Sequence, residues 1–209
     1  MRIAVCGTKG GSGKSTLAGL LALCLADADK YVVTLDRDPQ ATLSTWLRGL
    51  GGKDGSAKPT PNENEPYGRT TLGDYSNTSA SKPQIVIADF PPASPEALLK
   101  MLNEKSGFAW DILLVPCRPA VADIWSIRSF LDKLEGYNGK VRLVMNALDN
   151  SSISKAGSLD SLLEGIKTPR LKASLSRRAC YSYAMVNGWK ALDEKAKSEV
   201  LSLALEISR

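Results

Sequence analysis

Two lysines occur in the glycine-rich stretch GTKGGSGKST, residues 7–16, which directly follows the apolar run RIAVC. A glycine-rich turn between a strand and a helix lets backbone N–H groups converge on a phosphate without obstruction by Cβ atoms. The common loop pattern is Gly, four residues, then Gly-Lys-Ser/Thr, and counting back from Lys14 puts Thr8 in place of the first Gly. The stretch therefore predicts a phosphate-binding loop that is deviant at its start and contains a second lysine, Lys9.

The residue types in this loop match the parts of a nucleoside triphosphate and its metal ion. Lys14 is expected to neutralise the β and γ phosphates, Ser15 to ligate Mg²⁺, and Thr16 to hydrogen-bond the α phosphate. The alternative, a glycine turn with chance lysines, is disfavoured because a strand pattern precedes the loop and a helix pattern follows it. The predicted nucleotide-binding residues of the loop are Gly10, Gly11, Ser12, Gly13, Lys14, Ser15 and Thr16.

Three carboxylates follow predicted strands. Asp36 and Asp38 lie in DRDPQ, after the run YVVTL, and Asp89 ends the run IVIAD. Because the carboxyl ends of parallel strands share one edge of a sheet, all three can face the phosphates. We expect Asp89 to hold Mg²⁺ through water, Asp38 to orient or deprotonate the attacking water, and Asp36 to contact the Mg²⁺ hydration shell. The roles of Asp36 and Asp38 are interchangeable at this point, and Asp89 also fits an ordinary strand-end carboxylate.

Hydrophobic patterning predicts a single α/β domain over residues 1–209. Apolar runs typical of strands covered on both faces alternate with helical patterns, which favours a parallel, Rossmann-like twisted sheet flanked by helices. The expected strands are 2–6, 31–35, 85–89, 111–116 and 141–146, and the expected helices are 14–26, 41–49, 95–105, 121–135 and 190–208. Residues 51–84 break the alternation, since 20 of these 34 residues are Gly, Pro, Ser, Thr or Asn. We expect a polar surface excursion there, with 67–72 as a candidate edge strand.

The net charge of +5 is concentrated in one segment. Residues 165–192 contain six basic side chains and no acidic one. Such a segment indicates a polyanionic partner, nucleic acid first and acidic lipid second, although a plain solvated face is the other interpretation.

The cysteine and histidine content excludes some chemistry. The four cysteines form no C-x-x-C pair and the chain has no histidine, so a zinc site is not expected and the thiols are expected to be reduced. Any catalysis then relies on carboxylates, lysines and a metal ion. No leader-like segment or membrane-length apolar run is visible, which predicts a soluble cytoplasmic protein.

The motifs KGGSGKST, DRDPQ and IVIADFPP together resemble the ParA family of partition and positioning ATPases, in the deviant Walker A group of P-loop NTPases that also contains MinD. The stretch LLVPCRPAVAD resembles the family's Pro-x-x-Pro-x-x-x-Asp segment, here Pro116, Pro119 and Asp123. The resemblance covers 1–49 and 85–146, is absent for 51–84, and is one of layout only for 167–209. Phe90 departs from the pattern, because relatives often have a small residue or Thr there.

The resemblance implies a function for the second lysine. In the family this lysine, here Lys9, reaches across a two-fold interface to the phosphates of the partner subunit, so that two ATP molecules are sandwiched in a homodimer. Physically, a second cation near a triphosphate either stabilises charge in its own subunit or joins two chains through ATP. Lys9, Lys14 and Asp38 are thus the catalytic candidates of an ATP hydrolase with weak basal activity, stimulated by a ParB-like partner. Asn146 matches the family's adenine-contacting Asn, although an Asn that caps the following turn fits equally.

The resemblance also implies non-specific DNA binding by the ATP-bound dimer and therefore a nucleoid-associated location. The DNA-binding candidates are Arg177, Arg178 and Lys190, followed by Arg170 and Lys172. Membrane binding is not expected, because the polar face of the last predicted helix mixes both charge signs. The predicted function is plasmid or chromosome partition or cargo positioning. The alternatives are a small-molecule ligase of the dethiobiotin synthetase type, a MinD-like spatial regulator and an ATP-binding scaffold with negligible turnover.

Overall fold

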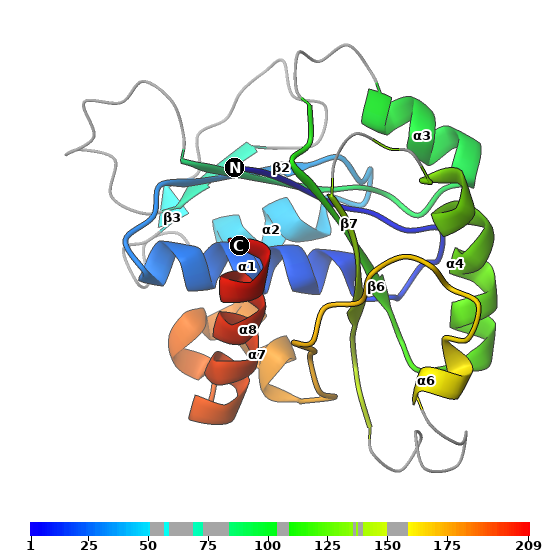
Figure 1. Cartoon of the computed structure of the whole chain (residues 1–209). Helices are drawn as coiled ribbons and strands as arrows, with labels where there is room; N and C mark the ends of the chain where they lie inside the picture. Colours follow the sequence, from blue (N-terminus) through cyan, green and yellow to red (C-terminus); the bar gives the residue numbers. More distant parts are fainter. Residues whose placement is uncertain are drawn as a thin grey trace.

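A computed structural model describes residues 1–50, 57–58, 69–72, 84–103, 109–135, 137, 140–149 and 159–209 (Figure 1). The strands are β1 (Arg2–Val5), β2 (Val32–Asp36), β3 (Ala57–Lys58), β4 (Arg69–Leu72), β5 (Ile85–Asp89), β6 (Ile112–Cys117) and β7 (Lys140–Met145). The helices are α1 (Lys14–Asp27), α2 (Thr42–Gly49), α3 (Pro95–Asn103), α4 (Val121–Lys133), α6 (Leu159–Leu162), α7 (Cys180–Asn187) and α8 (Glu194–Ile207), with a 3-10 turn η1 (Trp189–Ala191).

The described strands form one sheet in the order β3-β4-β2-β5-β1-β6-β7. The five strands from β2 to β7 in this order are parallel, whereas β4 runs antiparallel to β2 and β3 antiparallel to β4. Every residue of β2, β5 and β6 is buried, as expected for strands covered on both faces. The predicted α/β class with a parallel, Rossmann-like sheet is confirmed.

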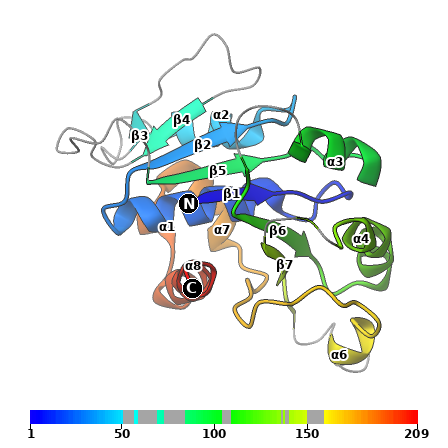
Figure 2. The same ribbon diagram turned by 45° about the horizontal axis from the view of Figure 1, so that its top comes forward.

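Helices cover both faces of the sheet (Figures 1 and 2). On one face the core is built from α1, α2, α7 and α8, with α1 almost entirely apolar and buried along its length. On the other face α3 and α4 pack against β1, β5 and β6, and α6 adds partly buried leucines. The packing of these two cores fixes the relative positions of the carboxyl ends of the central strands, which lie at one edge of the sheet.

Helix α2 is fixed by the close approach of one glycine to one tryptophan. A Cβ atom on Gly19 of α1 would lie 2.0 Å from the ring of Trp46, so only glycine fits there. The indole Nε1 of Trp46 also donates a hydrogen bond of 3.0 Å to the carbonyl of Ala184 in α7. These contacts anchor α2 and therefore the stretch from the end of β2 to α2, which contains Asp36 and Asp38.

Two predictions of elements need correction. The single helix predicted over 190–208 is wrong at its start, because η1 and an extended Leu192 precede α8, whose N-cap is Asp193 with a 2.8 Å hydrogen bond from the N–H of Ala196. The candidate edge strand over 67–72 is present as β4, but it lies between β2 and β3 rather than at the edge. Its residues Thr70, Thr71 and Leu72 are buried, so this part of the predicted surface excursion belongs to the sheet. The remainder of 51–83 lies outside the described residues apart from β3.

No helix in the described ranges combines the length and the apolar character that crossing a membrane requires. The four cysteines are free thiols.

Candidate nucleotide site

The predicted phosphate loop connects β1 to α1 at the carboxyl edge of the sheet (Figure 2). Two of its glycines have positive φ angles, +71° at Gly11 and +89° at Gly13, and Gly13 is the N-cap of α1. A Cβ on Gly13 would lie 2.0 Å from Nδ2 of Asn146, which itself donates a 2.8 Å hydrogen bond to the carbonyl of Ser12. Glycine is therefore required at this position by conformation and by space, and Asn146 supports the loop from β7.

Lys14 is held inside the loop. Its side chain is buried, and Nζ donates a 2.9 Å hydrogen bond to the carbonyl of Lys9. Burial lowers the pKa of Lys14, while the charges of Asp89 and Asp38 act in the opposite direction. The loop thus places one cation at the N-terminus of α1, where a phosphate also gains from the helix dipole.

Lys9 points to a different partner. Its Nζ forms an ion pair with Oδ1 of Asp123 in the first turn of α4, and Nε of Arg118 lies 2.6 Å from Oδ2 of the same carboxylate. Although burial acts to raise the pKa of Asp123, hydrogen bonds from Arg118 and Lys9 hold it below its ordinary value. Thr8, where the common pattern has glycine, donates from Oγ1 to the carbonyl of Ser126 at 3.0 Å. The deviant start of the loop is therefore tied to α4.

Asp36 and Asp38 lie where predicted but differ in surroundings. Both oxygens of the buried Asp36 accept backbone hydrogen bonds, Oδ1 from Asp38 at 3.0 Å and Oδ2 from Ser44 in α2 at 2.8 Å. Burial nevertheless raises the pKa of Asp36. Asp38 is half-buried, and its Oδ1 accepts from the N–H of Gln40 at 2.9 Å. Asp36 fixes the start of α2, whereas Asp38 is the more accessible carboxylate.

Asp89 is paired with Asp36 in the register of neighbouring strands, which brings two of the three predicted carboxylates together. Its side chain is 1% exposed, and within the described part of the chain neither of its oxygens has a hydrogen-bond partner. Burial raises the pKa of Asp89 to about 7, only partly offset by the nearby Ser15 hydroxyl and Lys14 charge. A buried carboxylate without a partner is expensive unless another group compensates its charge.

A hydrated Mg²⁺ fits this unpaired carboxylate. The described residues contain no group of three or more His, Cys, Asp or Glu side chains suited to bind a metal directly. Mg²⁺ usually keeps several waters and binds through one or two carboxylates and substrate phosphates, so a sparse protein contribution is expected. Ser15, Asp36 and Asp89 are the residues that would hold the ion, and its charge would balance that of the triphosphate.

Asn146 is buried, and its amide is already engaged on both sides. Besides the bond to Ser12, its Oδ1 accepts from the N–H of Ala147 at 2.8 Å, which is the turn-capping alternative. A hollow of about 410 Å³ is lined by Leu148, Asp149, Ser176 and Arg177, the first of which follows Asn146 by two residues. The adenine contact assigned to Asn146 stays a prediction.

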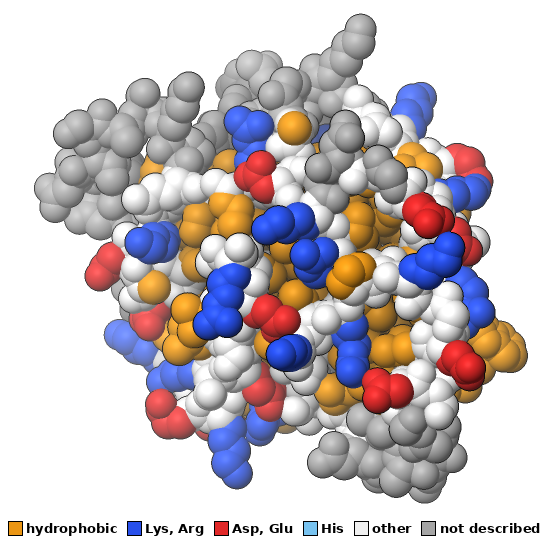
Figure 3. Space-filling model, in the orientation of Figure 1, with side chains coloured by type: hydrophobic (Ala, Val, Ile, Leu, Met, Phe, Trp, Pro, Cys, Tyr) orange, Lys and Arg blue, Asp and Glu red, His pale blue; other side chains and the backbone are white. Residues whose placement is uncertain are grey.

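The basic segment 165–192 does not form one continuous patch. Arg178 pairs with Glu199 of α8 at 2.6 Å and Arg170 with Asp160 of α6 at 3.2 Å. The remaining DNA-binding candidates, Lys172, Arg177 and Lys190, have exposed side chains. Over the face in Figure 3, Lys and Arg side chains are interspersed with Asp and Glu. Acidic residues distant in sequence thus neutralise part of the segment's charge.

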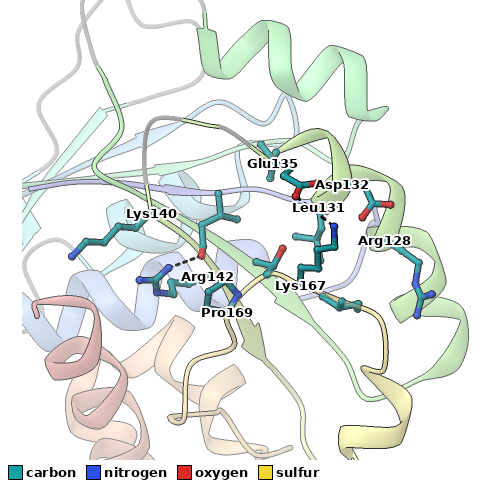
Figure 4. A pocket seen from close by; sticks show the side chains of 12 residues that line it. Arg128, Leu131, Asp132, Glu135, Lys140, Arg142, Lys167 and Pro169 are labelled. Atoms are coloured by element: carbon teal, nitrogen blue, oxygen red, sulfur yellow. Dashed lines mark hydrogen bonds and ion pairs between the residues drawn. The ribbon is translucent and has the colours of Figure 1, made fainter.

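Lys167 lies in a separate hollow at the amino end of β7, away from the phosphate loop (Figure 4). This hollow has a volume of about 310 Å³. Its charged lining residues are Arg128, Asp132, Glu135, Lys140, Arg142 and Lys167. Since Lys167 lies 3.6 Å from Glu135, this hollow too is of mixed charge. No motif in the sequence indicated it.

The fold and the site together define a P-loop nucleotide-binding protein. A buried strand leads into a glycine-rich loop, the loop opens a helix at a buried lysine, and an unpaired carboxylate ends the adjacent strand. The model of the CobQ/CobB/MinD/ParA nucleotide-binding domain matches residues 3–188 of the chain. The chain belongs to this family of nucleotide-binding domains, as its resemblance to ParA and MinD predicted.

Individual relatives agree with this assignment. Maintenance of carboxysome distribution protein A of Halothiobacillus neapolitanus is 26% identical over 195 residues, which are 89% of this chain and 84% of the relative. The septum site-determining protein MinD of Pyrococcus horikoshii, solved with Mg-ADP, has a TM-score of 0.69 at 16% identity, covering 100% of this chain and 96% of that one. The pNOB8 ParA bound to nonspecific DNA has a TM-score of 0.57 at 14% identity, covering 100% and 99%. At these identities the two structures show the shared fold.

Proposed function

We propose that this chain is an ATPase that dimerises through ATP, binds DNA without sequence preference as the dimer, and thereby positions a cargo in the cytoplasm on the nucleoid. The single observation that supports this best is the position of Lys9. Its Nζ is paired with Asp123 rather than with a group of its own phosphate loop, and its side chain is still 34% exposed. A cation held at the mouth of the site by an ion pair can be exchanged to the triphosphate of a second chain.

The other site residues bind the phosphates, the metal ion and the attacking water. Lys14 neutralises phosphate charge, Asp38 orients the attacking water, and Asp89 with Asp36 and Ser15 holds the hydrated Mg²⁺. The loop residues Gly10, Gly11, Ser12, Gly13 and Thr16 supply backbone and hydroxyl donors to the phosphates. Asp38 receives the water-orienting role because it is more accessible than Asp36, whose oxygens fix α2.

In this proposal, DNA is bound by basic side chains that form no ion pair with the other described residues. Lys172, Arg177 and Lys190 are exposed, and a dimer would present two copies of each. Doubling the number of phosphate contacts steepens both the affinity and its salt dependence. The fold shared with a ParA solved on nonspecific DNA supports this partner class.

One relative supports a proposal for the class of cargo. A protein named for carboxysome distribution is similar over most of this chain, which favours a large protein-built body as cargo, with a plasmid as the other member of the class. A ParB-like partner on the cargo would stimulate a slow basal hydrolysis and so release the dimer from DNA.

Retention of a random DNA duplex tests the proposal. The wild type is mixed with duplex and Mg²⁺ plus ATP, ADP or no nucleotide, and retention is expected with ATP alone. Lys9→Ala is expected to abolish retention while still binding ATP, because it removes only the cation that joins the chains. Lys30→Ala, an equal charge change at an exposed residue three positions after α1, is the matched control and should behave as the wild type. Retention that is independent of nucleotide, or unaffected by Lys9→Ala, would overturn the proposal.

A further inference from the structure

Arg37 lies between Asp36 and Asp38, and nothing in the proposed nucleotide chemistry requires a cation there. Its guanidinium carbon lies 5.4 Å from the centre of the Phe90 ring and 6.0 Å from that of Trp110. Phe90 directly follows Asp89. The side chain of Arg37 therefore links the two segments that contain the candidate catalytic carboxylates.

The two aromatic rings that Arg37 contacts are buried and pack against each other. Phe90 is 0% and Trp110 is 3% exposed, and their rings meet edge to face with centroids 5.7 Å apart and an interplanar angle of 81°. A planar guanidinium stacks well on such rings, and the attraction strengthens when the cation is desolvated. Phe90, which departs from the pattern of relatives, thereby has a specific contact.

The backbone supplies a second link at the same point. The N–H of Arg37 donates a 2.9 Å hydrogen bond to the carbonyl of Asp89, continuing the β2–β5 register in which Asp36 pairs with Asp89. Asp38 in turn donates its N–H to Asp36. A displacement of the residues 36–38 is thus coupled to residues 89–90 through both main chain and side chain.

We infer that Arg37 is a positioning residue, whose contact with Phe90 and Trp110 keeps Asp38 at a fixed distance from Asp89. This inference rests on the proposed ATPase function. Without the contact, the DRDPQ segment samples more conformations, and Asp38 is less often placed to orient water. Arg37 itself touches neither nucleotide nor water in this account, so its loss should lower the hydrolysis rate more than the nucleotide affinity.

A double-mutant cycle measures this coupling. Arg37→Met keeps the backbone bond and most of the side-chain length but removes the charge, and Phe90→Leu keeps an apolar side chain but removes the ring. Each is expected to lower kcat roughly tenfold while changing the dissociation constant of a fluorescent ATP analogue less than about twofold. The kcat of the double variant should be no lower than that of the less active single variant. Arg37→Lys should retain more activity than Arg37→Met, because it keeps the positive charge. Arg48→Met, at the exposed end of α2, is the matched control and should leave kcat unchanged.

Hydrogen exchange of the nucleotide-free protein gives a readout that needs no ATPase activity. In both Arg37→Met and Phe90→Leu, amide exchange is expected to accelerate together at residues 37, 38, 40 and 41 and at residues 90 and 93, since Pro39, Pro91 and Pro92 have no amide hydrogen. Acceleration confined to the segment that contains the substitution, or multiplicative losses of kcat in the cycle, would overturn the inference. A wild type without ATPase activity would instead count against the proposed function, and the exchange data would still decide the role of Arg37.

Discussion

Lys9 and Asp123 form an ion pair within one chain. The lysine that is proposed to act on a second chain therefore has an anionic partner in its own chain. Asp123 also accepts from Arg118 at 2.6 Å and is almost fully buried. Two cations therefore share one carboxylate. The strength of the Lys9–Asp123 ion pair depends on how strongly Arg118 also binds the Asp123 carboxylate. Arg118 therefore influences how readily Lys9 is released to form the proposed dimer.

Replacing Arg118 should weaken the ATP-bound dimer. In Arg118→Met the carboxylate has Lys9 as its remaining cation, so release of Lys9 becomes less favourable. In Asp123→Asn the anion is gone and Lys9 is free. We expect the protein concentration at half dimerisation, measured by sedimentation with Mg-ATP, to rise about three- to tenfold for Arg118→Met and to fall for Asp123→Asn. Shifts of the same sign in both variants would exclude competition for Lys9.

Asp89 is predicted to destabilise the nucleotide-free fold near neutral pH. Its pKa is raised from an ordinary value of 3.8 to about 7, so the folded state binds this proton more tightly than the unfolded state does. The carboxyl is neutral in both states below about pH 4, and stability is lost as the pH rises from about 4 to about 7. Asp89→Asn should therefore raise the free energy of unfolding at pH 8 by about 1–3 kcal/mol, and by less at pH 5.

Guanidinium unfolding at the two pH values measures this gain, in the absence of nucleotide and Mg²⁺. Asp132→Asn removes an exposed carboxylate of α4 and should change stability by less than about 0.5 kcal/mol. A variant Asp89→Asn that is less stable than the wild type at pH 8 would show that this carboxylate is compensated.

Glu199 is expected to make stability fall in acid. It accepts hydrogen bonds from Arg178, Tyr181 and the Ser176 N–H and hydroxyl, which join α8 to α7 and to the segment before it. Although burial acts to raise the pKa of Glu199, these bonds lower it from an ordinary 4.5 to about 2. The contribution is present above about pH 4.5 and is lost as the pH falls from about 4.5 toward 2.

The substitution Glu199→Gln should thus cost about 2–3 kcal/mol at pH 7, with the difference from the wild type shrinking at pH 3. Urea titrations at both pH values measure it. Glu194→Gln is the matched change on the same helix, where the carboxylate is 90% exposed, and should have little effect. An equal loss at pH 3 and pH 7 would argue that packing, rather than the charge of Glu199, stabilises this corner.

Lys172 and Lys190 should contribute to the salt dependence of DNA binding. Removing one cation that neutralises a DNA phosphate changes the slope of log affinity against log salt by about 0.9, so the double alanine variant of a dimer should show a slope shallower by up to about 3–4. Fluorescence anisotropy with a labelled duplex at several salt concentrations measures the slope. Lys100→Ala on α3 is the control, and an unchanged slope in the double variant would place the DNA elsewhere.

The residues at the carboxyl edge of the sheet could be predicted from the sequence, but the contacts that hold the neighbouring loops in place could not. Asp36 and Asp89 could be brought together because apolar runs identify parallel strands, and parallel strands end at one edge. The pairing of Lys9 with Asp123 could not be foreseen, since 114 residues separate them and only the tertiary fold brings α4 beside the loop. The basic segment shows the same limit, because Glu199 and Asp160, which neutralise Arg178 and Arg170, lie outside it.

Local sequence signals explain where α8 begins but not the presence of α7. Asp193 followed by a Glu and an apolar helical pattern is an N-cap signal, and it explains why α8 begins after the 3-10 turn η1. The sequence does not predict helix α7, because two of its four exposed residues, Tyr183 and Val186, are large and hydrophobic, so no amphipathic pattern is visible. The other two exposed residues are Ser182 and Asn187. Its tertiary contact with Trp46 of α2 stabilises α7, and this contact cannot be read from the sequence pattern of the helix.

Complementation between two inactive variants tests most directly whether Lys9 serves the nucleotide of the neighbouring chain. Lys14→Ala is expected to lose ATP binding, and Lys9→Ala to bind ATP but not to dimerise, so each alone should be inactive. In a one-to-one mixture, the Lys9→Ala chain can bind ATP and receive the intact Lys9 of the Lys14→Ala chain, which completes one site. We predict that the mixture forms heterodimers and hydrolyses ATP above either variant alone. If the wild type is active and the mixture remains monomeric and inactive, Lys9 acts within its own chain and the account is contradicted.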